Sequence, residues 1–249
     1  MSLIELLVVI SIIGVLAGLL LPAVGNVKKK ARVVQAQKDM ADMKGAISVY
    51  QHDYSRLPAS SAPVAPDTTP SASMLGTDFT YGTTGTGYGT NVYNNNNVAV
   101  AGNNYQAGNA ELMVILTAST FAGYTPHSSV QSDRRNPRKI GYFNAKSSGA
   151  SGATAGKGLG TDGVMRDPWG NPYIVALDLN YDGWVSNSVY NGNTVNGFNT
   201  GLARQGVAGS STWALKDSVM IFSFGADGMF ATTNAANLDP NKDNVLSWK

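Results

Sequence analysis

The chain has 249 residues, of which 43% are hydrophobic and only 14% are charged, and its formal net charge is +2. A polynucleotide binder needs clustered lysines and arginines to follow phosphates, so this charge gives no support to a nucleic-acid partner. The chain has no cysteine, which excludes disulfides, thiolate metal sites and a cysteine nucleophile. Its two histidines leave little room for a histidine-rich metal or acid-base site. No spacing of nucleophile and base stands out, and we do not expect an enzyme.

The first predicted element is an apolar segment from Leu3 to Leu21, almost wholly apolar apart from Glu5 and Ser11. As a helix this segment would be roughly 28 Å long, close to the hydrocarbon thickness of a bilayer. A secretory signal peptide is disfavoured because no basic residue precedes the segment. A buried core helix is disfavoured because the segment has no polar face. We therefore expect residues 1–25 to form a helix that crosses a membrane.

Glu5 is the residue in this segment that needs an explanation. An ionised carboxylate near the start of a lipid-embedded helix costs on the order of 2.5 to 3.5 kcal/mol, and less near the interface. Either the side chain reaches the headgroups or is protonated, or a cation pairs with it inside a protein assembly. Lys28 is the first lysine or arginine of the chain, so that cation would be an α-amino group, its own or a neighbour's.

The segment MSLIELLVVI, Met1 to Ile10, followed by Gly14, Ala17 and Pro22, resembles the mature N-terminus of type IV pilins and type II secretion pseudopilins. The resemblance implies that a prepilin peptidase has removed a leader, although Met1 stands where the family usually has Phe. It also implies a methylated Met1 amine that pairs with Glu5 of an adjacent subunit. Methylation keeps the positive charge, so this ion pair is physically possible.

The resemblance implies a structural subunit that polymerises into a type IV pilus-like or type II secretion pseudopilus filament. Its partners would be identical subunits and the assembly machinery. It would lie in the inner membrane before assembly and then in a periplasmic or extracellular filament. The alternative is a non-polymerising membrane-anchored calcium-binding module or adhesin, which has no need of Glu5. The sequence does not separate secretion from adhesion, motility or DNA uptake.

Residues 26–56 are predicted to continue the helix as an amphipathic stem. Apolar residues three and four positions apart form one stripe, which is core by default. They are Val33, Ala36, Met40, Met43, Ile47, Tyr50 and Tyr54. The whole helix would have about fifty residues and a length of roughly 80 Å. We expect it to end at Arg56-Leu57-Pro58 and to kink or locally melt at Pro22, which lacks an amide donor.

Residues 57–160 are predicted to form a polar, loop-rich insertion, because Ser, Thr, Pro, Gly and Asn dominate from Pro63 to Gly108. The apolar stretch after Asn109 predicts a short capped helix at 110–117 that packs back on the stem. The insertion is either a decoration or an outer surface for adhesion, glycan attachment or lateral packing. The sequence does not choose between these.

Residues 161–249 are predicted to form an antiparallel sheet. The turn Asp167–Pro172 leads into a strand at Tyr173–Leu177, and a second strand from Val219 leads into a turn that ends at Gly228. Together with Asp243–Trp248, these blocks resemble the major pseudopilin of type II secretion. The resemblance implies an α+β pilin fold, in which a long N-terminal helix packs against a C-terminal antiparallel sheet.

The same resemblance implies a calcium site in the C-terminal turns. Asp227, Asp243 and Asn244 would supply side-chain ligands, and Phe224 a backbone carbonyl. Calcium takes six to eight oxygen ligands, and Asn244 in place of the family's second acid removes one charge. An acidic loop without an ion is the alternative. The lack of cysteine favours calcium, because many type IV pilins fasten this end with a disulfide.

The hexapeptide from Asp178 to Gly183 matches the first half of an EF-hand loop, with oxygen ligands at Asp178, Asn180 and Asp182. The twelfth position of that loop is Val189 instead of glutamate, so a bidentate ligand would have to come from elsewhere. A second calcium site and a plain hairpin turn both stay open.

Overall fold

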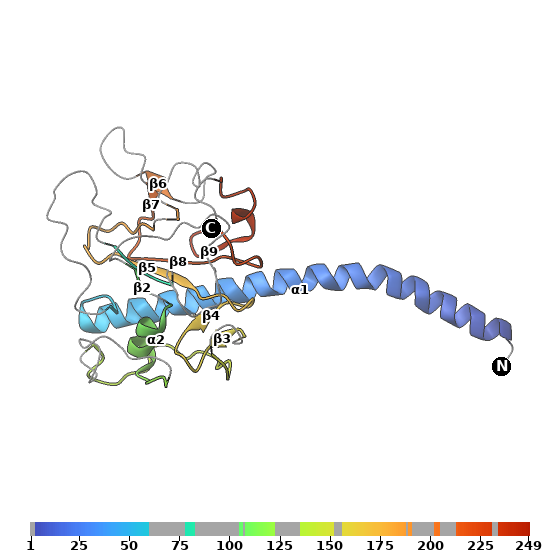
Figure 1. Ribbon diagram of the computed structural model, residues 1–249, viewed down its shortest axis with the longest axis horizontal. Helices are drawn as coiled ribbons and strands as arrows, with labels where there is room; N and C mark the ends of the chain where they lie inside the picture. Colours follow the sequence, from blue (N-terminus) through green and yellow to red (C-terminus); the bar gives the residue numbers. More distant parts are fainter. Residues whose placement is uncertain are drawn as a thin grey trace.

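A computed structural model describes residues 3–59, 78–82, 105–106, 108–122, 135–151, 156–187, 189–190, 202–204, 213–230 and 234–249. Two α-helices, α1 (Leu3–Tyr54) and α2 (Ala110–Thr117), accompany a set of short strands (Figure 1). The strands are β1 (Phe79–Tyr81), β2 (Tyr105–Gln106), β3 (Gly158–Leu159), β4 (Met165–Arg166), β5 (Ile174–Leu177), β6 (Ala203–Arg204), β7 (Trp213–Ala214), β8 (Val219–Ser223) and β9 (Val245–Leu246). A 3₁₀ turn, η3 (Asn241–Asp243), precedes β9.

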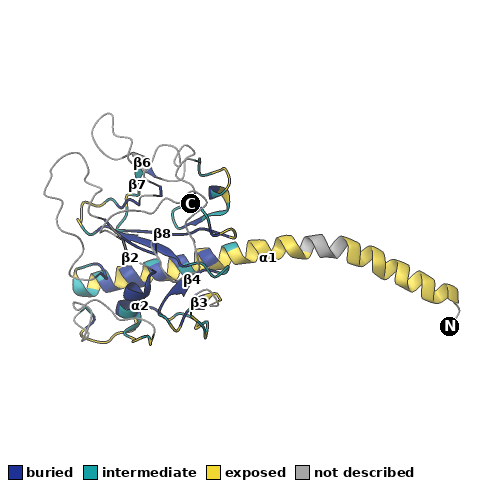
Figure 2. Ribbon diagram, in the orientation of Figure 1, coloured by how far each residue is buried: buried dark blue, intermediate teal, exposed yellow. Residues whose placement is uncertain are grey.

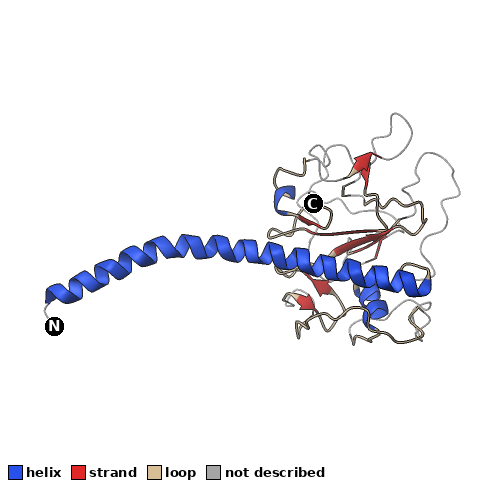
Figure 3. Ribbon diagram, turned by 180° about the vertical axis from the view of Figure 1, so that it is seen from behind, coloured by secondary structure: helices blue, strands red, loops and turns tan. Residues whose placement is uncertain are grey.

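Helix α1 is one continuous element of 52 residues, which confirms the predicted length and the predicted end before Arg56. The helix is not interrupted at Pro22, so the expected local melting does not occur in the isolated chain. Instead, α1 curves over the half that leaves the head (Figure 3). The exposed half and the half that packs on the head are distinguished by colour in Figure 2.

The main sheet has the strand order β2-β1-β5-β8-β9. Strands β1, β5, β8 and β9 pair antiparallel, whereas β2 joins β1 in parallel. Strand β5 lies in the centre, with Ile174 opposite Phe222 on β8. The predicted α+β class, with a long N-terminal helix and an antiparallel sheet, is therefore confirmed. The sheet is not wholly C-terminal, because β1 and β2 come from the predicted loop-rich insertion.

The central strands are buried on both faces, and alternate residues enter two separate cores. Val175 and Leu177 face α1 and α2, whereas Ile174 and Ala176 face the C-terminal loops. The stem stripe enters the first core as predicted. Its residues Ala36, Met40, Met43, Ile47 and Tyr50 are fully buried, and Val33 and Tyr54 pack at its edge. The sheet thus lies between the helices and a loop layer that contains the chain's C-terminus (Figure 1).

Helix α2 forms at Ala110–Thr117 and packs on α1 as predicted, but Asn109 is not its side-chain cap. The Asn109 side chain instead donates to the Met165 and Tyr173 carbonyls, both at 2.9 Å, and accepts from the Met165 amide at 2.7 Å. Asn109 is fully buried, and these three bonds satisfy its amide in the interior, where water is not available. The predicted cap is therefore wrong.

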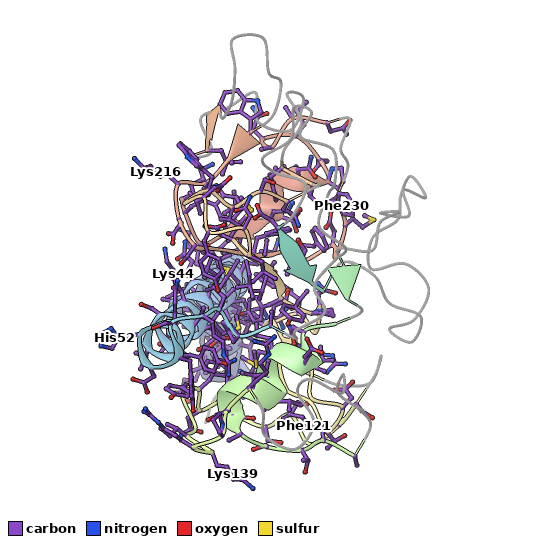
Figure 4. All side chains as sticks on the ribbon, turned by 90° about the vertical axis from the view of Figure 1, so that its left-hand side faces the viewer. Lys44, His52, Phe121, Lys139, Lys216 and Phe230 are labelled. Atoms are coloured by element: carbon purple, nitrogen blue, oxygen red, sulfur yellow. The ribbon has the colours of Figure 1, made fainter. Side chains whose placement is uncertain are left out.

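An ion pair between Lys44 of α1 and Asp217, which precedes β8, joins the helix to the sheet. Figure 4 views the head along α1 and shows His52 projecting outward from the helix. His52 is exposed, so it does not contribute to a buried site.

Candidate functional site

Three turns that are far apart in the sequence meet at one end of the sheet. They are Asp167–Pro172 before β5, the turn after β8 and the segment before β9. The pairing of Ser223 with Val245 brings Asp243 and Asn244 beside the turn that follows β8. Asn171 donates its side-chain amide to the Gly225 carbonyl at 2.9 Å, which joins the first turn to the second. The blocks predicted to build a calcium site are therefore neighbours.

Asp243 organises the turn that follows β8. Its Oδ2 accepts from the Ala226 amide at 2.7 Å and from the Asp227 amide at 3.2 Å. Its Oδ1 is buried and accepts no hydrogen bond from any described residue. A buried carboxylate oxygen without a donor costs free energy, unless a cation takes the place of the donor.

Asn244 has the same property. Its Nδ2 donates to the Tyr190 hydroxyl at 2.8 Å, which determines the orientation of the amide. The amide Oδ1 is buried and accepts no hydrogen bond within the described part of the chain. Two unsatisfied oxygens on consecutive residues therefore lie at this end of the sheet, both on predicted calcium ligands.

Asp227 lies on the exposed side of the same turn. Its Oδ1 accepts from the Met229 amide at 2.8 Å. Partial burial raises the pKa of Asp227, and the negative charges of Asp243 and Asp239 add to the rise. This electrostatic repulsion is what a bound cation would remove.

Phe224, the predicted carbonyl ligand, is fully buried, with its ring stacked on Phe230 at a centroid distance of 5.0 Å. The backbone that would offer the carbonyl is therefore anchored. Gly225 follows it with a φ of +68°, a conformation that suits glycine.

The turn before β5 supports the loop through a buried carboxylate. Asp167 is fully buried and accepts from the Trp169 amide at 2.8 Å, the Asn171 amide at 2.9 Å and the Ser223 hydroxyl at 2.5 Å. The Ser223 Oγ in turn accepts from the Gly225 amide at 3.0 Å. Burial raises the pKa of Asp167 to about 6, although these hydrogen bonds oppose the rise.

The donor set fits calcium better than other metals, since it consists of carboxylate, amide and backbone oxygens. Within the described ranges, no three His, Cys, Asp or Glu side chains form a group that could hold a metal ion. Any cation at this turn would be held by Asp227 and Asp243, with the Asn244 amide and backbone carbonyls completing the set.

The predicted second loop is a set of turns closed by its own side chains. Asp178 accepts from the Gly183 amide at 2.9 Å and from the Asp182 amide at 3.3 Å. Asn180 accepts from the Asp182 amide at 3.1 Å, and Asp182 accepts from the Trp184 amide at 2.8 Å. Asp178 is buried, whereas Asn180 and Asp182 are exposed. Val189, at the twelfth position, is buried in the second core.

Two residues of these sites were missed by sequence reasoning. Tyr190 is buried against Phe222 and Trp248 and positions Asn244, but its contacts join segments that no local motif connects. Asp78 lies next to the second loop and is buried. Its burial was not predicted because the sequence around it is polar. Only the register of β1 on β5 could have revealed it.

Two of the three predicted assembly residues, Glu5 and Pro22, lie in the free half of α1. Met1 lies outside the described residues, Glu5 is in the first turn of α1, and Pro22 is within the helix. The side chains of residues 19–23 are not described, so the predicted apolar segment is only partly covered. Within the described residues, no helix was found that is both long and apolar enough to cross a membrane. The membrane expectation stays a prediction.

No family model, curated protein or solved structure matches this chain.

Proposed function

We propose that the chain is a structural subunit that polymerises through the N-terminal half of α1 into a filament of the type IV pilus or type II secretion pseudopilus kind. The observation that carries this proposal is the exposure of large apolar side chains on α1 from Leu3 to Leu16. Figure 2 colours this part of the helix, beyond the head, as exposed. Five consecutive residues, Leu6 to Ile10, are each 47–59% exposed. Because consecutive residues point in different directions around a helix, the apolar surface surrounds it.

Such a helix needs an apolar environment on every side. A single partner helix would cover one stripe, whereas a lipid bilayer or a bundle of several identical helices would cover all of them. When the helix moves from the bilayer into a bundle of identical helices, its buried apolar surface changes little, since lipid tails are as apolar as leucine. A subunit can therefore wait in the inner membrane and then enter the core of a filament.

Glu5 favours the filament over the membrane. In lipid its carboxylate is costly, whereas a neighbouring subunit offers the methylated amine of Met1. The pair would fix the axial register of each incoming subunit. The amphipathic half of α1 would then present the folded head on the outside of the filament, because its apolar stripe is already covered by the sheet.

In this proposal calcium fastens the C-terminal end of the head. The loop from Phe224 to Asn244 would hold the ion through Asp227, Asp243 and Asn244. The two buried oxygens without donors support this part of the proposal.

The test uses the full chain in a bacterium with a type IV pilus or type II secretion assembly machinery. Sheared filaments are quantified by electron microscopy and immunoblotting, and the membrane fraction is measured in parallel. Glu5→Ala should lower filament yield at least tenfold and leave the chain in the membrane. Ser11→Ala is the matched control, since the Ser11 hydroxyl donates to the Val8 carbonyl of its own helix, at 2.8 Å.

Filaments at wild-type yield in Glu5→Ala would overturn the role of Glu5. A wild-type chain that stays in the membrane and never enters filaments would favour the alternative, a membrane-anchored calcium module or adhesin. Mass spectrometry of the N-terminal peptide for a methylated Met1 is an independent check.

A further inference from the structure

The register of the main sheet places two acids opposite each other. Phe79 of β1 pairs with Leu177 of β5 in an antiparallel ladder, so the next pair along the ladder is Asp78 and Asp178. The Asp178 amide donates to the Ser218 carbonyl on the β8 side, at 3.0 Å, and so points away from β1. Asp78 and Asp178 therefore form a non-hydrogen-bonded pair, in which Cα atoms lie about 4.5 Å apart and side chains are closest.

Both carboxylates leave the same face of the sheet and both are buried. Asp78 is 5% exposed and Asp178 is 3% exposed. Like charges directly opposite each other on a sheet are destabilising, and burial makes the repulsion larger. Burial raises the pKa of Asp78 to about 8, and Asp178 and Asp182 add to the rise.

Asp78 has one oxygen engaged and one without a partner. Its Oδ2 accepts from the Ser186 amide at 2.7 Å, which anchors the carboxylate beside the segment that leaves the loop. Its Oδ1 is buried and accepts no hydrogen bond from a described residue. This orphaned oxygen is independent of the acidic motif in the sequence and is the sign of a ligand.

No lysine or arginine within the described ranges forms an ion pair with either acid. The Lys216 ammonium lies over the Trp184 ring instead, with its Nζ 5.9 Å from the ring centroid. The negative charge of Asp78 and Asp178 must therefore be neutralised by a proton or by a bound cation.

We infer that Asp78 and Asp178 are the carboxylate ligands of a second calcium site, separate from the C-terminal loop. Asp78 takes the place of the missing acid at Val189 and reaches the loop from another strand. The remaining ligands are oxygens of the loop from Asp178 to Gly183 and water. Calcium is favoured over zinc because the donors are oxygens, and over magnesium because a loop adapts to calcium's variable geometry.

The site would join two parts of the head that are distant in the sequence. Asp78 directly precedes β1, within the predicted polar insertion, and Asp178 directly follows β5. A bound ion would hold the start of β1 on the sheet, where Asn187 already donates to the Thr80 hydroxyl oxygen at 3.3 Å. This inference does not depend on polymerisation, because calcium binding is measured on the single chain.

The test is calcium titration of the full chain in mild detergent, after removal of divalent cations with a chelator. The Asp227→Asn background removes a charge from the C-terminal loop and isolates the second site. Asp227→Asn should bind one calcium equivalent by isothermal titration calorimetry. Adding Asp78→Asn should remove that equivalent or weaken it at least tenfold, whereas adding Asp42→Asn, an exposed acid on α1, should leave it unchanged.

A thermal melt distinguishes a variant that has lost a calcium ligand from one that no longer folds. Without calcium, Asp78→Asn should melt at or above the wild-type temperature, since asparagine keeps the shape of the side chain and removes a carboxyl group that is costly to bury in its charged form. Calcium should then raise the melting temperature of Asp227→Asn but not of the double variant. Unchanged calcium binding after Asp78→Asn, or no binding by Asp227→Asn, would overturn the inference. Filament yield is measured separately, so either result leaves the proposed function as it stands.

Discussion

Gly225 lies so close to Asp243 that no side chain fits between them. A Cβ placed on Gly225 would come within 2.3 Å of the Asp243 carbonyl oxygen and 2.8 Å of its Oδ2. The turn after β8 and the segment before β9 therefore pack backbone against backbone. This close contact brings the Asp243 carboxylate to the amides of Ala226 and Asp227.

The first prediction concerns that contact. Gly225→Ala should lower the free energy of unfolding by about 3 kcal/mol and weaken calcium binding, because the methyl group displaces Asp243. Denaturant unfolding and calcium titration of the full chain measure both effects. Gly149→Ala is a matched control, since Gly149 has a similar φ of +70° but open space around it.

The control isolates backbone strain from steric contact. Gly149→Ala should cost about 1 to 2 kcal/mol, the penalty of a left-handed residue with a Cβ, and leave calcium binding unchanged. If the two variants lost the same free energy of unfolding, Asp243 would be displaced at no energetic cost, which would contradict the prediction.

The second prediction concerns the charge of the C-terminal site. Asn244→Asp should tighten calcium binding about tenfold, because calcium affinity rises with the number of charged ligands. The Tyr190 hydroxyl, whose pKa burial raises above its usual value, can donate to the new carboxylate. Without calcium the variant should be less stable than the wild type, since a third acid joins Asp227 and Asp243.

Asn237→Asp is the matched control for Asn244→Asp. It adds the same charge at an exposed position of the same loop and should change calcium affinity little. Calcium titration calorimetry compares the two variants. Weaker binding in Asn244→Asp, or an equal gain in Asn237→Asp, would contradict the assignment of Asn244 as a ligand.

The third prediction is a pH dependence of stability from Asp167. Its pKa is raised from 3.8 to about 6, so between these values the folded chain holds a proton that the unfolded chain releases. The contribution of protonated Asp167 to stability is complete below about pH 4 and is lost as the pH rises through 6. In Asp167→Asn this contribution should be independent of pH.

The difference between wild type and Asp167→Asn is the quantity to measure, by urea unfolding from pH 4 to 7 in the presence of a chelator. It should fall by up to about 1.4 kcal/mol per pH unit as the pH rises. Other titrating groups, Asp78 among them, cancel because both proteins contain them. A constant difference across this range would show that Asp167 has an ordinary pKa in the folded chain.

Much of the fold could be predicted from local patterns. The stripe from Val33 to Tyr54 repeats at helical spacing, and the structure buries it as expected. Strands β5 and β8 were visible because their apolar stretches are bounded by turns with proline or glycine. The Asn109 cap failed because a tertiary partner, the Met165 and Tyr173 backbone, competed with a local one.

The candidate site, too, could be predicted only in part. Asp227, Asp243 and Asn244 could be named only from the family resemblance of the C-terminal blocks, whereas the hexapeptide from Asp178 could be named from its alternating oxygen side chains. Which of their side-chain oxygens are buried without a hydrogen-bond donor could not be predicted, because the donors come from residues on other strands. Tyr190 and Asp78 carry no local signature at all.

The sequence by itself determined the long helix, its division into an apolar half and an amphipathic half, and the acid at Glu5, because these depend on composition and on a period of 3.6 residues. Only the tertiary structure decided which oxygens are buried without donors and which acid stands opposite Asp178. Those properties follow from strand register, in which one residue of slip would move Asp78 to the other face of the sheet.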